Sequence, residues 1–157
     1  MIPTLEGRWQ TRALLFILAG LPVTFFFALY WADFRIGLIF SPPFNTPFKV
    51  LIALFCVGFA FDLVYIFIQS FRWDRDWPFV FQFLSMIFEF GVLLVLINAN
   101  LIPGIPPALL NAGPHLFYYH FALVFIASYV FLVTVLQVLF VRWRYKGGEI
   151  GRFRTRF

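Results

Sequence analysis

The chain has 157 residues and a net charge of +5, and 62% of its residues are hydrophobic while only 12% are charged. A soluble domain averages about 45–50% apolar and about 25% charged residues, so this composition is typical of a membrane protein. The single cysteine, Cys56, excludes an intrachain disulfide and a thiolate metal cage, and the two histidines are too few for a His-rich metal site.

Four runs of about 20 largely apolar residues predict transmembrane helices. In chain order they are residues 13–31, 50–71, 78–97 and 116–141. The first run is longer than the apolar core of a signal peptide, so we expect it to be retained. We expect it to bend at Pro22, with Thr24 and neighbouring helices satisfying the freed backbone groups. The predicted fold is all-α, a single domain of residues 1–157 that forms an antiparallel bundle of four transmembrane helices.

The lysines and arginines predict the orientation, because loops on the cytoplasmic side carry an excess of them. One side holds ten: Arg8, Arg12, Arg72, Arg75, Arg142, Arg144, Lys146, Arg152, Arg154 and Arg156. The other side holds only Arg35 and Lys49. We therefore expect both termini to be cytoplasmic, with residues 142–157 as a basic cytoplasmic tail. Such a distribution indicates membrane anchoring and gives no reason to expect nucleic-acid binding.

The stretch RWDRDWP, residues 72–78, is expected to be the cytoplasmic turn between the second and third spans. Pro78 suits the first turn of the following helix, where a missing N–H costs nothing. An Arg-Trp pair recurs at each cytoplasmic boundary, and tryptophan is enriched at membrane interfaces. These side chains are interpreted as interfacial anchors, with a binding motif as the alternative. They are Arg8, Trp9, Arg72, Trp73, Trp77, Arg142 and Trp143.

The two outer connections differ in character. Residues 34–40 (FRIGLIF) are apolar enough to lie along the membrane interface. Residues 98–114 are uncharged and broken by four prolines and two glycines. We expect an ordinary loop there, and a re-entrant segment is the alternative, since irregular backbone at membrane depth needs protein or water to satisfy it.

Two acidic residues fall inside the spans, Asp62 and Glu89. Counted from the cytoplasmic turn, both lie about 15–16 Å deep at a rise of about 1.5 Å per residue, which is near mid-bilayer. Polar residues at i, i+3 and i+7 accompany each acid on one helical face. Together they form a predicted polar seam between the second and third spans: Asp62, Tyr65, Gln69, Gln82, Ser85 and Glu89. Gly58 would allow close helix approach, and Gln137 is a further candidate from the fourth span.

No lysine or arginine lies inside the four predicted spans, so we expect neither acid to have a buried counter-ion. One acid should then be neutral or the two should share a proton. Three interpretations follow: a hydrogen bond that locks the hairpin, a proton or cation site, and a docking point for another membrane protein. His120 is expected at the outer boundary, which disfavours a metal centre built from His120, Asp62 and Glu89.

Phenylalanine is abundant, with 25 of 157 residues. Aromatic spans could line a pigment, quinone or haem pocket, but phenylalanine also suits lipid contact and helix packing. We prefer lipid contact and packing, and no cofactor is implied.

Three motifs, LEGRWQTR, RWDRDWP and RWRYKGG, separated by four spans, resemble a family of uncharacterised bacterial four-span integral membrane proteins. The resemblance extends over essentially the whole chain. It implies the four-span topology, and it carries over no activity and no catalytic residues.

The expected function is that of a non-enzymatic integral membrane protein, an accessory or assembly subunit of a larger membrane complex. The alternative is a small proton- or cation-coupled transporter or channel that uses Asp62 and Glu89. The expected partners are the lipid bilayer and either other membrane subunits or further copies of the chain. We expect the protein in a bacterial inner membrane or an internal photosynthetic membrane. The cytoplasmic segments offer neither a catalytic triad nor a phosphate-binding loop, so we expect no enzyme activity.

Overall fold

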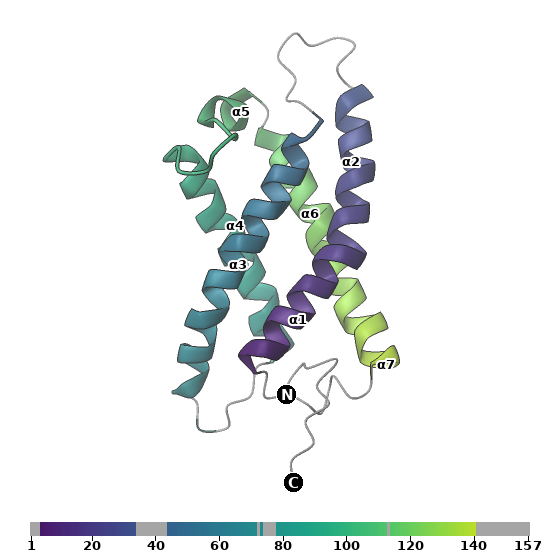
Figure 1. The fold of residues 1–157 in the computed structure, drawn as a ribbon, viewed down its shortest axis with the longest axis vertical. Coiled ribbons are helices and arrows are strands. Elements are labelled where there is room, and N and C mark those ends of the chain that lie inside the picture. The colour runs from purple at the N-terminus through teal and green to yellow at the C-terminus, as the bar shows by residue number, and fades with distance from the viewer. Residues whose placement is uncertain (1–3, 34–43, 72, 74–77, 113, 141–157) are drawn as a thin grey trace.

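The computed structural model describes residues 4–33, 44–71, 73, 78–112 and 114–140. All regular structure in these ranges is helical, and four helices are long and apolar enough to cross a membrane. They run up and down in one bundle (Figure 1). The predicted all-α fold with four membrane-spanning helices is therefore confirmed.

The first helix begins earlier than predicted, at Leu5 and not near residue 13. It comprises α1 (Leu5–Leu15), a π-helical turn η1 (Phe16–Gly20) and α2 (Leu21–Asp33). The Thr4 hydroxyl caps its start by accepting a hydrogen bond from the Gly7 N–H at 3.0 Å, and Glu6 lies in the first turn, where a negative charge is favourable. Arg8 and Arg12 consequently belong to the helix and not to a cytoplasmic segment.

The helix changes direction just before Pro22, as Figure 1 shows where α1 meets α2. Proline lacks an N–H and its ring clashes with the carbonyl four residues earlier. The π-helical turn comes immediately before it, and the Leu21 N–H bonds the Phe16 carbonyl five residues back. Such turns commonly produce bends. Thr24 has a different role from the predicted one, because its hydroxyl pairs with His120.

The second and third spans follow the predicted boundaries closely. They are α3 (Thr46–Ser70) and α4 (Phe79–Asn98). Pro47 lies in the first turn of α3, where its missing N–H is harmless. The two helices pack against each other, so the faces that carry the polar seam are adjacent.

The connection between α4 and α6 is part of the packed core. It contains the short helix α5 (Pro107–Ala112), which lies at one end of the bundle in Figure 1. Ile105 and Leu110 are buried in the same cluster as Leu93 and Phe117. The segment thus folds back onto α4 and α6 and covers that end of the core. The other outer segment, residues 34–40, lies outside the described residues.

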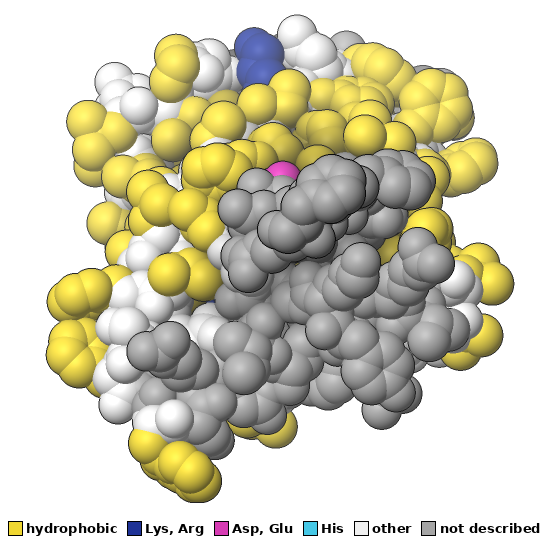
Figure 2. Space-filling view, turned by 60° about the horizontal axis from the view of Figure 1, so that its bottom comes forward, with side chains coloured by type: hydrophobic (Ala, Val, Ile, Leu, Met, Phe, Trp, Pro, Cys, Tyr) yellow, Lys and Arg dark blue, Asp and Glu magenta, His cyan; other side chains and the backbone are white. Residues whose placement is uncertain are grey.

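The fourth span is α6 (Pro114–Phe131), a second π-helical turn η3 (Leu132–Leu136) and α7 (Gln137–Leu139). Its inner face contributes Phe117 to the cluster near α5 and Leu132 and Leu136 to a second cluster with Leu15. Many large apolar side chains are exposed, among them Phe26, Phe67 and Val138. Figure 2 shows hydrophobic side chains over much of the described part of one face. This surface belongs in lipid, so the protein is membrane-embedded.

Candidate functional site

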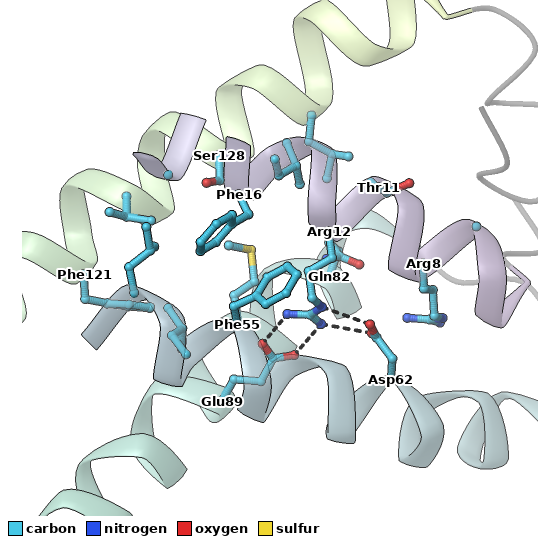
Figure 3. A pocket seen from close by; sticks show the side chains of 18 residues that line it. Arg8, Thr11, Arg12, Phe16, Phe55, Asp62, Gln82, Glu89, Phe121 and Ser128 are labelled. Atoms are coloured by element: carbon cyan, nitrogen blue, oxygen red, sulfur yellow. Dashed lines mark hydrogen bonds and ion pairs between the residues drawn. The ribbon is translucent and has the colours of Figure 1, made fainter. Parts of the chain in front are cut away.

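The centre of the bundle holds an ionic cluster made by three helices (Figure 3). Arg12 of α1 lies between Asp62 of α3 and Glu89 of α4. Its Nε and Nη2 donate to Asp62 Oδ2 and Oδ1, both at 2.9 Å. Its Nη1 and Nη2 donate to Glu89 Oε2 at 2.8 Å and Oε1 at 3.0 Å. All four carboxylate oxygens therefore accept a charge-assisted hydrogen bond from one guanidinium, the strongest class of hydrogen bond in proteins.

Both acids are buried, with 2% of each residue exposed, while the Arg12 side chain keeps 18%. The prediction that neither acid has a buried counter-ion is wrong. Its premise placed Arg12 outside the first span, but a helix that starts at Leu5 carries Arg12 about two turns inward. The two acids share Arg12, so the argument for a shared proton loses its basis.

Gly58 of α3 makes room for this arrangement. A Cβ atom built at Gly58 would overlap the Arg12 guanidinium and would lie 2.8 Å from Glu89 Oε2. We expected this glycine to permit close approach of two helices. Its effect is more specific, because it admits the guanidinium between α3 and α4.

The rest of the predicted seam lies in the same interface. Arg8 is buried, its Nη2 donates to Gln69 Oε1 at 3.2 Å, and its guanidinium carbon lies 5.9 Å from the centre of the Tyr65 ring. The Tyr65 hydroxyl donates to the Ser85 carbonyl at 3.4 Å. With all four groups ionised, the charges of Arg8, Arg12, Asp62 and Glu89 cancel.

The predicted anchors divide into four groups. Arg8 departs from the prediction, because it is buried in the bundle. Trp9 is half-buried and stacks on Phe59 of α3, with ring centres 5.2 Å apart. Trp73 is 97% exposed, as expected of an interfacial side chain. The other anchors, Arg72, Trp77, Arg142 and Trp143, lie outside the described residues, as does the tail of residues 142–157.

A cavity of about 130 Å³ adjoins the ionic cluster. Arg12, Glu89 and Gln82 line one end of it, and most of the remaining lining is apolar, including Phe55 and Phe121. Figure 3 shows the charged groups gathered at one side and Phe121 at the other. The fourth span lines this cavity with Phe121, Val124, Ser128 and Leu132. Gln137, the candidate from the sequence, is not among the lining residues.

His120 forms a separate polar contact. Its Nε2 lies 2.9 Å from the Thr24 hydroxyl, its ring lies 5.0 Å from that of Phe27, and 2% of the residue is exposed. It is buried between α2 and α6, in the second turn of α6, and takes no part in the ionic cluster. Within the described ranges, no group of three His, Cys, Asp or Glu residues is arranged to hold a metal ion.

Sequence reasoning missed Arg12, yet two signals pointed to it. Thr4 and Glu6 form a helix start ahead of both arginines, and Arg8 and Arg12 are four residues apart, on one helical face. A helix that begins at Leu5 presents this face to its neighbours.

Fold and site together define a membrane-embedded four-helix protein with an ion-paired centre. No protein-family model, curated protein or solved structure matches the chain.

Proposed function

We propose that this is a non-enzymatic integral membrane protein that acts as an accessory or assembly subunit of a larger membrane complex. One observation carries the proposal: Arg12 engages all four oxygens of Asp62 and Glu89. An ionisable residue inside a membrane is by default a candidate for proton or ion transfer. Two-pronged pairing with one guanidinium holds both carboxylates in fixed positions between three helices, an arrangement suited to a structural role.

The cluster is better suited to fixing the bundle. Arg12 connects α1 to α3 and α4, which gives three helices one defined arrangement. Small charged or polar groups in a core can specify register and partner choice even where they add little net stability. A rigid module with apolar outer faces is suited to packing against the helices of another protein in the bilayer.

The proposed setting is a bacterial inner membrane or an internal photosynthetic membrane, with both termini in the cytoplasm. Removing Arg8 and Arg12 from the count leaves eight basic residues on the cytoplasmic side against two on the other. The bias therefore still favours this orientation. The resemblance to bacterial four-span membrane proteins agrees with the setting.

The test is extraction from native membranes in mild detergent, followed by measurement of the mass of the intact particle. An accessory subunit should appear in a stoichiometric hetero-complex far larger than the 18.4 kDa chain. A monomer or a pure homo-oligomer would contradict the proposal.

A second candidate is a small proton- or cation-coupled transporter, favoured by the cavity beside Arg12. Ligand entry or rotation of Arg12 would free a carboxylate for a proton. In proteoliposomes this candidate predicts an ion or proton flux that Asp62→Asn and Glu89→Gln abolish, since an amide cannot release a proton. Equal flux for wild type, both variants and empty liposomes would exclude it.

A further inference from the structure

The hydroxyl of Ser128 has an unusual position in the core. Ser128 is 5% exposed and lines the cavity from α6, opposite the helices that carry the ionic cluster. Its side chain makes no hydrogen bond to any other residue in the described part of the chain. The Ser128 hydroxyl is open to the cavity, and polar groups in such positions commonly face water, an ion or a ligand.

Gln82 supplies a second hydrogen-bonding side chain to the same cavity, from α4. Its backbone carbonyl accepts from Ser85, but its side-chain amide has no partner among the residues described. In Figure 3 Gln82 lies beside Arg12, whereas Ser128 lies near Phe16. The cavity thus has hydrogen-bonding groups at separate points of a mainly apolar wall. Few polar groups on an apolar lining are typical of ligand sites.

The size and lining limit what can enter. An apolar cavity of roughly 150 Å³ accommodates benzene, and this one measures about 130 Å³. Phe16, Phe55 and Phe121 provide aromatic surfaces for a flat ring. A whole porphyrin or carotenoid is far too large. The charges of the ionic cluster are already paired, so a neutral ligand is preferred over a charged one.

We propose that the cavity between α1, α3, α4 and α6 binds a single neutral six-membered ring that carries a hydroxyl or carbonyl group, and that Ser128 bonds this group. The ring is either a small free molecule or the end of a longer lipid-soluble one. This inference goes beyond the accessory role and does not depend on it.

The test is ¹⁹F NMR of 4-fluorophenol added to the full chain in detergent micelles. We expect a saturable bound signal that unlabelled phenol displaces. Ser128→Ala keeps the space but removes the hydroxyl, and should weaken binding about fivefold, as expected for loss of one hydrogen bond. Val124→Phe should abolish binding, because Val124 lines the cavity and is buried. Thr134→Ala, which lies outside the cavity, should bind like wild type.

Two further measurements complete the design. 4-Fluorotoluene has nearly the same shape as 4-fluorophenol but no hydrogen-bonding group. It should bind wild type more weakly than 4-fluorophenol does, whereas the two compounds should bind Ser128→Ala with equal affinity. A phenol with a decyl chain at position 4 distinguishes the two kinds of ligand. If it displaces 4-fluorophenol, the natural ligand is the end of a longer molecule. If it does not, the natural ligand is a small free molecule. Non-saturable partitioning into micelles, the same for every variant, would overturn the proposal, and so would binding to Ser128→Ala that is as tight as binding to wild type. Should Val124→Phe not fold, Ser128→Ala and displacement by phenol decide alone.

Discussion

Arg12 serves as counter-ion to two carboxylates because its Nη2 donates to both of them. The two remaining contacts, from Nε and Nη1, make each pairing two-pronged. This geometry uses the planar guanidinium fully, and a lysine could not reproduce it. The cluster should therefore behave as one unit, in which loss of the arginine and loss of all three charges have different consequences.

Replacing Arg12 with methionine should lower the free energy of unfolding by about 3–5 kcal/mol, because two carboxylates remain buried without a partner. The triple variant Arg12→Met, Asp62→Leu, Glu89→Met should recover most of the loss, since no charge remains to be buried. The free energies of unfolding of the single and triple variants can be measured on the purified proteins in detergent, with circular dichroism as the signal. Equal destabilisation of the single and triple variants would show that the helix contacts of Arg12 matter and its charge does not.

Gly58→Ala should destabilise the protein by about 1–3 kcal/mol, the usual cost of overpacking a core. The added methyl would occupy the position of the Arg12 guanidinium. Gly91→Ala in α4 is the matched control, because a Cβ there meets no atom within 4 Å. It should leave stability unchanged or raise it slightly, as alanine favours helix over glycine. The same unfolding assay applies, and equal effects of the two changes would contradict the role given to Gly58.

Among the contacts between helices, one polar pair joins the first span to the fourth. Thr24 of α2 and His120 of α6 meet in an otherwise apolar interface, next to the ring of Phe27. The bend introduced by η1 and Pro22 lies directly before Thr24. The pair fixes the upper half of the first helix against α6, while Arg12 fixes its lower half against α3 and α4.

Thr24→Val keeps the side-chain shape but removes the partner of His120 Nε2. We expect a loss of about 0.6–1.7 kcal/mol, the range found for hydrogen bonds between membrane helices. Thr134→Val is the control, because the exposed Thr134 hydroxyl bonds only the Val130 carbonyl of its own helix at 2.6 Å. Thermal unfolding in detergent distinguishes the two. A control that loses as much as Thr24→Val would mean that valine itself is poorly tolerated in these helices.

The extents of α3 and α4 could be predicted from hydropathy to within a few residues, and α3 begins at Thr46, four residues before the predicted start. The start of the first helix could not be predicted from hydropathy, because Arg8 and Arg12 lower the hydropathy of that segment. Their charges are acceptable in the core only through Gln69, Asp62 and Glu89, which are 50 or more residues away along the chain. Helical periodicity predicted which faces of α3 and α4 carry the polar seam. It could not predict Arg12, which joins Asp62 and Glu89, because Arg12 comes from another helix.

For the whole molecule, we predict the orientation in the membrane from the eight basic residues that remain on one side when Arg8 and Arg12 are left out of the count. Reporter fusions at residues 75 and 157 should both read cytoplasmic, and a fusion at Leu101, which is exposed at the far end of α4, should read the opposite side. The physical reason is the excess of arginine in loops that stay in the cytoplasm. An external signal at residue 75 or 157 would overturn the orientation and leave the fold unaffected.

The separation of Arg12 from its partners has a consequence for biosynthesis. Arg12 leaves the ribosome 77 residues before Glu89. An arginine costs about 2.5–3.5 kcal/mol to insert at the centre of an isolated helix and less toward its ends, and Arg12 lies about two turns from the start of the first helix. We therefore expect the first turns of this helix to stay near the membrane surface until α3 and α4 have entered the bilayer. Its final tilt and depth are acquired late, when the third span is delivered, and a chain truncated before Glu89 should be a substrate for membrane quality control.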